Sequence, residues 1–297
     1  MSSQRQDRGM SGLAEIKNIL NNNIIKNHST RTMIVEGSTD IKLFSKLISK
    51  YRNQVRIINP FRTHNLKQNN KGEVIKIIKI CNQEDWVKNH QGNRGIFGIV
   101  DADFMNLNRG INIKNLLLTK FHDIDIEIFT SSYILEKYLN DAYPKKNFSK
   151  SQLLKIRRIC LKLASMFGKY LLLLEMNHIY SNTRNQKNFK IKNFLERDNI
   201  NELVLKTDLI EENILNNNWD VNLNDLNEIN NINLKQLANS HDYFVIFWRL
   251  TFEKEEFPLT SKFCARDEKY CEKMLKLSYI CKCIIDQEFL AKIFAYF

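Results

Sequence analysis

At 297 residues, with 43% hydrophobic residues and a formal net charge of +12, the chain has the composition of a globular protein that is rich in cations. No apolar run approaches the roughly 20 residues that span a bilayer, and the polar stretch from Met1 to Gly9 lacks an apolar signal region. We therefore expect a cytoplasmic protein without a membrane segment. The positive charge favours a polyanionic partner such as nucleic acid, although an AT-rich genome would also enrich a chain in Lys.

The first part of the chain predicts alternating strands and helices. After a polar tail and a helix over 13–25, a short buried strand is expected at 32–35, and Ser38 is expected to cap a helix that runs to about Lys50. A strand over 55–60, a helix over 74–87 and a strand over 95–100 follow. This alternation is typical of an α/β fold with a parallel sheet covered by helices.

Two of the expected strands end in acidic residues. Glu36 and Gly37 follow the first strand, and Asp101 and Asp103 follow the strand at 95–100. Functional residues of an open parallel sheet gather at the carboxyl ends of its strands, and carboxylate oxygens are the ligands that Mg²⁺ or Mn²⁺ prefers. The pattern predicts a site that binds one of these ions and cuts phosphodiesters. Gly37 would allow a phosphate to approach the backbone there.

A fourth strand is expected over 123–128, where Asp123, Asp125 and Glu127 alternate with isoleucines. At a period of two residues, the three carboxylates would share one face of the strand. Either a metal or the wet face of an edge strand would explain this pattern. The acids that follow the earlier strands favour the metal.

From Ser149 onward the pattern changes to helices. A long helix carries an apolar stripe from Leu153 to Leu174, and further helices are expected over 241–252 and 268–297. We predict three segments: a tail and helix over 1–29, a catalytic α/β domain over 30–145 and a mainly helical domain over 146–297. The six cysteines lack paired CxxC spacing, which favours buried thiols.

Several of these motifs together resemble the TOPRIM fold, which has a Rossmann-like parallel sheet. They are Val35-Glu36-Gly37-x-x-Asp40, Val100-Asp101-Ala102-Asp103 and the acidic run 122–127, followed by Leu135-Glu136-Lys137. More closely, these motifs resemble those of the small TOPRIM proteins that are encoded beside OLD-like or ABC-type ATPases in anti-phage loci, as in the PARIS defence system. The segment His241-Asp242 is similar to a Gly-His-Asp segment of this family, with Ser240 in place of the glycine.

This resemblance implies a metal-dependent nuclease effector that cleaves tRNA and is toxic when its ATPase partner releases it. It makes Glu36 the general base or first metal ligand, Asp101 and Asp103 metal ligands, and Asp125 and Glu127 supporting ligands. It also implies a homodimer in the active state. The chain has no phosphate-binding loop of its own, so nucleotide sensing is expected to come from the partner.

Contacts to nucleic acid are expected from a basic, aromatic segment and from one helical lysine. The candidates are Lys137, Arg184, Lys187, Phe189 and Lys190. A surface loop would have the same composition. Two other functions stay open, a DNA nuclease of the OLD type and a non-catalytic adaptor that binds nucleic acid or the ATPase.

Overall fold

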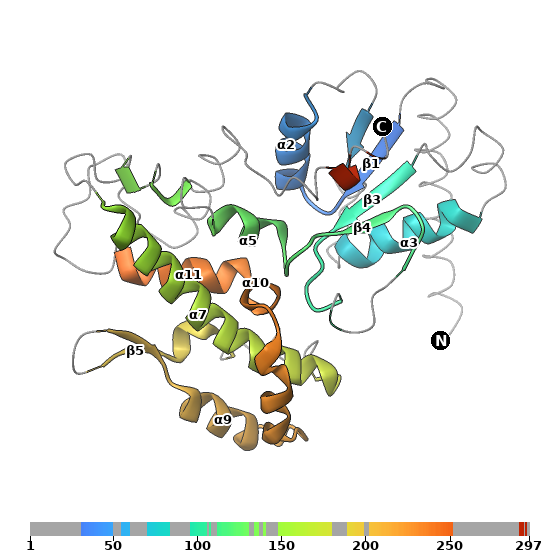
Figure 1. Ribbon diagram of the computed structural model, residues 1–297. Coiled ribbons are helices and arrows are strands. Elements are labelled where there is room, and N and C mark those ends of the chain that lie inside the picture. Colours follow the sequence, from blue (N-terminus) through green and yellow to red (C-terminus); the bar gives the residue numbers. More distant parts are fainter. Residues whose placement is uncertain are drawn as a thin grey trace. The chain divides into compact units, whose positions relative to one another are not determined.

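A computed structural model describes parts of both halves of the chain (Figure 1). The described residues are 31–49, 55–59, 70–83, 96–105, 107, 112–130, 134–136, 139–140, 148–179, 189–198, 202–251, 291–293 and 295. The expected helix over 13–25 and most of the expected helix over 268–297 lie outside the described residues. The chain divides into two compact units, and their boundary passes between Val100 and Asp101, with residues 111–119 returning to the first unit.

The first unit contains a parallel four-stranded sheet, as the α/β pattern predicted. Its strands lie in the order β2 (Val55–Ile58), β1 (Arg31–Val35), β3 (Ile96–Val100) and β4 (Leu116–Leu118). Every residue of β3 is buried, as expected for a central strand covered on both faces. The carboxyl ends of β1 and β3 are aligned, because Val35 pairs with Ile99.

Two helices complete the described sheet layer. Helix α2 (Ser38–Leu47) packs beside β2, and α3 (Asn70–Gln83) packs on β3. The contact with α3 requires glycine at position 98, since a Cβ atom there would lie 2.8 Å from Ile78 Cγ1. The sequence placed both helices, but α3 begins four residues before the predicted start at 74.

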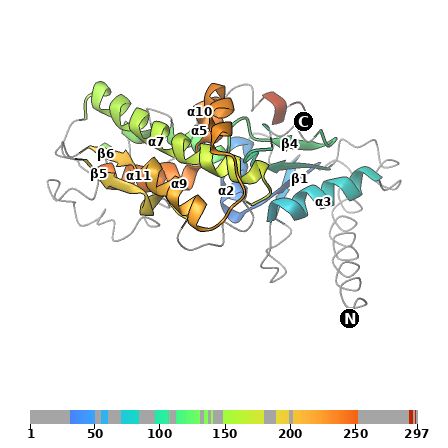
Figure 2. The ribbon, with the colours of Figure 1, turned by 90° about the horizontal axis from the view of Figure 1, so that it is seen from below.

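The second unit is mainly helical, as predicted, and is built around α7 (Lys150–Met176). Ser149 caps this helix through a hydrogen bond from the Gln152 N–H. Figure 2 shows α9 (Thr207–Asn216), α11 (Ser240–Thr251) and a short hairpin grouped alongside α7. The unit's other described elements are α5 (Ile124–Phe129), η3 (Ile191–Asn193), the hairpin strands β5 (Leu195–Arg197) and β6 (Leu203–Leu205), η4 (Leu223–Asn231) and α10 (Leu234–Leu237).

Helix α10 crosses α7 at very close range. A Cβ atom at Gly168 would lie 2.0 Å from the carbonyl oxygen of Leu237. Around this crossing, the apolar stripe predicted for α7 is buried from Leu153 to Leu174. None of the described helices is both long and apolar enough to cross a membrane.

The predicted fourth strand over 123–128 is wrong. Residues 124–129 form helix α5, and the fourth strand of the sheet, which pairs with the free side of β3, is the short apolar run Leu116–Leu118. The helix begins at this point because the Asp123 carboxylate accepts a hydrogen bond from the Ile126 N–H, 2.9 Å away, and thereby caps the helix. Residues two apart point about 200° away from each other on a helix, so the acids of this segment do not share a face.

Candidate functional site

The residue that follows β1 is Glu36, and its backbone is fixed by the neighbouring strand. Asn59, which follows β2, donates a hydrogen bond from Nδ2 to the Glu36 carbonyl oxygen at 3.0 Å. The Glu36 residue is half-buried. The sheet therefore holds the acid at the carboxyl edge of β1, where the sequence predicted it.

Gly37 begins helix α2 in an extended conformation, with φ of −133°, and its N–H donates to Asp40 Oδ2 at 2.7 Å. A Cβ atom at position 37 would lie only 3.1 Å from that oxygen. Glycine therefore makes room for the Asp40 carboxylate, whereas the sequence predicted room for a phosphate. Gly37, not Ser38, is the capping position, and its N–H already binds an anionic group.

The other predicted ligands belong to the second unit. Asp101 follows β3 directly and is half-buried, and its Oδ1 accepts a hydrogen bond from the Ile124 N–H at 3.2 Å. Asp103 has a left-handed backbone with φ of 45°, which is uncommon for a residue other than glycine. Its N–H donates to the His122 carbonyl oxygen at 2.6 Å. Strained backbone of this kind clusters at functional sites.

His122 links Asp103 to a buried carboxylate. The His122 ring is fully buried, and its Nδ1 lies 3.2 Å from Asp123 Oδ2 and 3.7 Å from Asp103 Oδ1. Phe104 packs edge-on against the ring, with 4.9 Å between the centroids. The contact with Asp123 gives His122 a structural role within the second unit. His122 Nε2 is buried and has no hydrogen-bond partner among the described residues.

Asp123 is a buried carboxylate with several hydrogen-bond donors around it. It accepts hydrogen bonds from the Ile126 N–H at 2.9 Å and the Ser240 N–H at 3.0 Å, besides its contact with His122. Burial would raise the pKa of Asp123, but the hydrogen bond and charge of His122 and the two backbone N–H groups lower this pKa below its ordinary value. Asp123 is thus an ionised structural group. The sequence did not predict its contact with Ser240, although the resemblance singled out the segment that Ser240 begins.

The predicted supporting ligands are not arranged as expected. Asp125 is half-buried on α5, and the side chain of Glu127 lies outside the described residues. Because this segment is helical, the shared acidic face on which both predictions depended is absent. A supporting role for Asp125 or Glu127 therefore has no geometric basis in this segment.

Two of the predicted nucleic-acid contacts, Phe189 and Lys190, lie among the described residues. Phe189 is buried at 5% exposure and packs against Phe167 and Trp219, with ring centroids 5.5 and 5.2 Å away. A buried ring cannot stack on a base, so this prediction is wrong in the present fold. Lys190 is exposed. Lys137, Arg184 and Lys187 lie outside the described residues.

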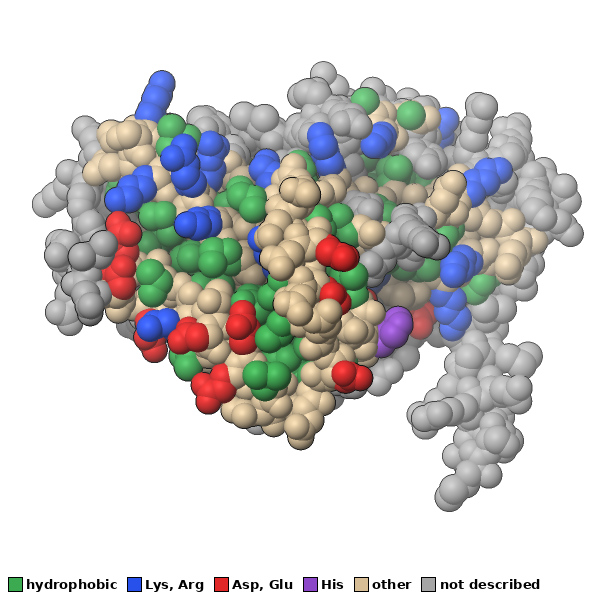
Figure 3. Space-filling model, turned by 60° about the horizontal axis from the view of Figure 1, so that its bottom comes forward, with side chains coloured by type: hydrophobic (Ala, Val, Ile, Leu, Met, Phe, Trp, Pro, Cys, Tyr) green, Lys and Arg blue, Asp and Glu red, His purple; other side chains and the backbone are tan. Residues whose placement is uncertain are grey.

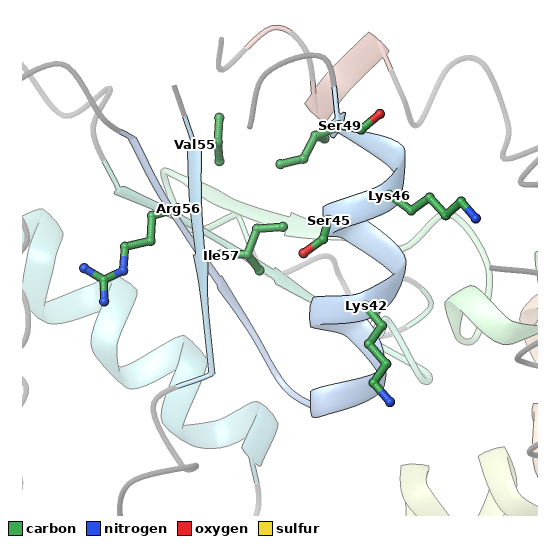
Figure 4. A pocket seen from close by; sticks show the side chains of 8 residues that line it. Lys42, Ser45, Lys46, Ser49, Val55, Arg56 and Ile57 are labelled. Atoms are coloured by element: carbon green, nitrogen blue, oxygen red, sulfur yellow. The ribbon is translucent and has the colours of Figure 1, made fainter. Parts of the chain in front are cut away.

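A hollow of about 620 Å³ lies between α2 and β2, with cationic residues around it. Figure 4 shows Ser45 and Ile57 pointing toward each other across this hollow. The ends of Lys42 and Lys46 point away from it, and the Arg56 side chain lies on the other side of β2. The hollow therefore does not focus positive charge on a ligand.

The proposed acidic residues offer donors that suit a divalent cation. Glu36, Asp101 and Asp103 supply hard oxygen ligands of the kind that Mg²⁺ and Mn²⁺ bind. Within the described part of the chain, no three His, Cys, Asp or Glu residues are grouped so that they could hold a metal ion. The donor chemistry thus fits such an ion, while the described residues by themselves do not assemble a complete ligand set.

The sequence was also compared with known proteins. It matches no protein-family model and no curated protein.

Proposed function

We propose that the chain is a metal-dependent nuclease with the TOPRIM type of α/β sheet, and that Glu36, Asp101 and Asp103 are its hydrolytic residues. One observation carries the proposal. Strands β1 and β3 are parallel neighbours with Val35 paired to Ile99, and each strand is followed directly by a carboxylate. Carboxyl ends of adjacent parallel strands are where α/β proteins bind their ligands.

The residues divide the chemistry between them. A divalent ion, when bound, would neutralise charge on the scissile phosphate and acidify a water or sugar hydroxyl. Glu36 is the proposed general base, since its carboxylate can accept the proton of the attacking hydroxyl. Asp101 and Asp103 are the proposed ligands, and the hydrogen bonds from Ile124 and to His122 hold these two residues in place.

The biological setting of the proposal comes from the resemblance described above. The favoured substrate is tRNA, and DNA is the alternative. We propose a cytoplasmic effector of an anti-phage system that an OLD-like or ABC-type ATPase restrains and that acts as a homodimer. The net charge of +12 supports a polyanionic substrate.

A direct test incubates the purified chain with tRNA or plasmid DNA in Mg²⁺, Mn²⁺ or a chelator. We expect tRNA cleavage that needs a divalent ion and is lost in Glu36→Gln and Asp101→Asn. Glu212→Gln is the matched control, because this exposed acid on α9 carries the same charge. Nicked DNA with intact tRNA would support the DNA nuclease, and no cleavage of either would refute the proposal.

A non-catalytic adaptor is the second candidate, and the hydrogen bond from the Gly37 N–H to Asp40 favours it, because this N–H then serves the fold where a nuclease would use it on a substrate phosphate. The two candidates differ in cells that express the chain without its ATPase. A nuclease should be toxic, and Glu36→Ala should remove the toxicity. If Glu36→Ala leaves the toxicity unchanged, the adaptor is the better explanation.

A further inference from the structure

The outer side of helix α7 carries a row of cations, Lys155, Arg158 and Lys162, which we call the basic face. Residues three and four positions apart lie on one side of a helix, so these side chains are neighbours. All three are exposed, and the Lys155 side chain is 71% accessible. The opposite side of the helix is the buried stripe from Leu153 to Leu174, which fixes the orientation of the basic face toward solvent.

The acidic residues that the structure describes do not neutralise this face. Lys155 reaches Glu202 at 4.0 Å, a pair between two exposed side chains that contributes little. Arg158 and Lys162 form no ion pair with any other described residue. Within α7, Glu175 is the only acid, and it lies in the last turn.

Charges of opposite sign are instead collected on another helix of the same unit. Helix α9 contains Asp208, Glu211 and Glu212 and no Lys or Arg. Figure 3 shows Lys and Arg side chains gathered at the upper left of the view, with Asp and Glu side chains below them. Codon bias would scatter lysines over the surface, whereas this separation of charge is what binding to a polyanion requires.

The spacing of the basic face also suits a chain of phosphates. Seven residues separate Lys155 from Lys162, which corresponds to about 10 Å along a helix. Along the axis of a duplex, the phosphates of one strand recur about every 3.4 Å, so about three of them fall within this length. Arg158 lies between the two lysines and adds planar donors that match phosphate oxygens.

We propose that the basic face of α7 binds the phosphate backbone of the nucleic acid that the enzyme cleaves. The inference rests on the proposed function for the identity of the polyanion. It replaces the binding surface that the sequence had placed around Phe189, whose ring is buried. The hydroxyl groups, bases and sequence of the substrate play no part in this contact, which would be made with phosphates alone.

The test measures tRNA binding to the full chain in a chelator, over a range of salt concentrations. The variant Lys155→Gln/Arg158→Gln/Lys162→Gln is compared with Lys42→Gln/Lys46→Gln/Lys79→Gln, which removes the same charge from exposed positions of α2 and α3. Each lost phosphate contact lowers the salt slope by about 0.7, so the α7 variant should lose a slope of about 2 and about 100-fold in affinity at 0.1 M salt. The control should keep the wild-type slope.

Equal losses in both variants, unchanged binding in the α7 variant, or no binding by the wild type would each overturn the inference. Thermal unfolding checks that the variants are folded, and Arg158→Gln alone, with an expected slope change of about 0.7, serves if the triple variant does not fold. Cleavage assays separate this inference from the proposed function. If binding depends on α7 but no cleavage occurs, only the nuclease proposal is refuted. If cleavage occurs but the α7 variant binds like the control variant, only the proposed role of the basic face is refuted.

Discussion

Replacing Asp123 with asparagine should destabilise the second unit by about 2–4 kcal/mol at neutral pH. Oδ1 accepts from the Ile126 N–H, and Oδ2 accepts from the Ser240 N–H and lies 3.2 Å from His122 Nδ1. An amide has one acceptor oxygen, so at least one buried donor would face an NH₂ group at a cost of about 1–3 kcal/mol. The remaining bonds would also lose the carboxylate charge, which roughly halves their strength.

The effect should depend on pH in a defined direction. The pKa of Asp123 is lower in the folded chain than its ordinary value, mainly because the contacts with His122, Ser240 and Ile126 outweigh burial. The folded state therefore binds fewer protons than the unfolded state, and stability from this group is complete above the ordinary pKa of about 3.9. It is lost as the pH falls through the lowered folded value. The wild type and Asp123→Asn should thus converge in stability as the pH decreases below about 4.

Urea denaturation followed by tryptophan fluorescence measures this difference, since Trp219 and Trp248, two of the three tryptophans, belong to the second unit. Asp220→Asn is the control, because Asp220 is exposed and loses the same charge. We expect its midpoint to stay near the wild-type value. A loss below 1 kcal/mol for Asp123→Asn at pH 7, or the same loss at pH 7 and pH 3, would refute the structural role assigned to this carboxylate.

Three further changes test the packing and the site. Gly168→Ala should lose at least 2 kcal/mol in denaturation, although alanine usually favours a helix, because its Cβ would overlap the Leu237 carbonyl group; a stabilised variant would contradict the close crossing. Phe189→Ala should cost about 3–5 kcal/mol in stability and leave the tRNA affinity of the folded variant unchanged, whereas an affinity loss of about 1–3 kcal/mol at an unchanged salt slope would restore its stacking role. Asp103→Gly should be about 1 kcal/mol more stable than Asp103→Ala, because only glycine adopts the left-handed φ without strain, and both should lack cleavage; equal stability would argue against the strained backbone.

The sequence predicted the first unit's sheet well because its signals are local. β1 and β3 are buried apolar runs bounded by charged or turn residues, and both were placed to within one residue. The long amphipathic helix α7 was also placed correctly by its apolar stripe. By contrast, β4, β5 and β6 contain three residues each, which is too short for a periodic pattern to emerge.

Phe189 shows a different reason for error. Its neighbours in the sequence, Lys187 and Lys190, indicated an exposed basic loop. In the fold, its ring meets Phe167, 22 positions earlier, and Trp219, 30 positions later. Burial of an aromatic ring among distant partners leaves no trace in the composition of the surrounding segment, so the basic character of the stretch was misleading.

The acidic residues show which structural roles can be predicted from neighbouring residues in the sequence and which depend on distant ones. Glu36 and Asp101 follow strands that any reader of the sequence can recognise, and their place at the sheet edge follows from chain direction alone. Asp123 has the same chemical group and a similar acidic neighbourhood, but its role depends on the N–H of Ser240, 117 residues away. An acid alternating with isoleucine therefore carries little information about metal binding, while an acid directly after a buried parallel strand carries more. That distinction is why the proposed hydrolytic residues are those after β1 and β3, and why Asp123 is assigned to holding the fold.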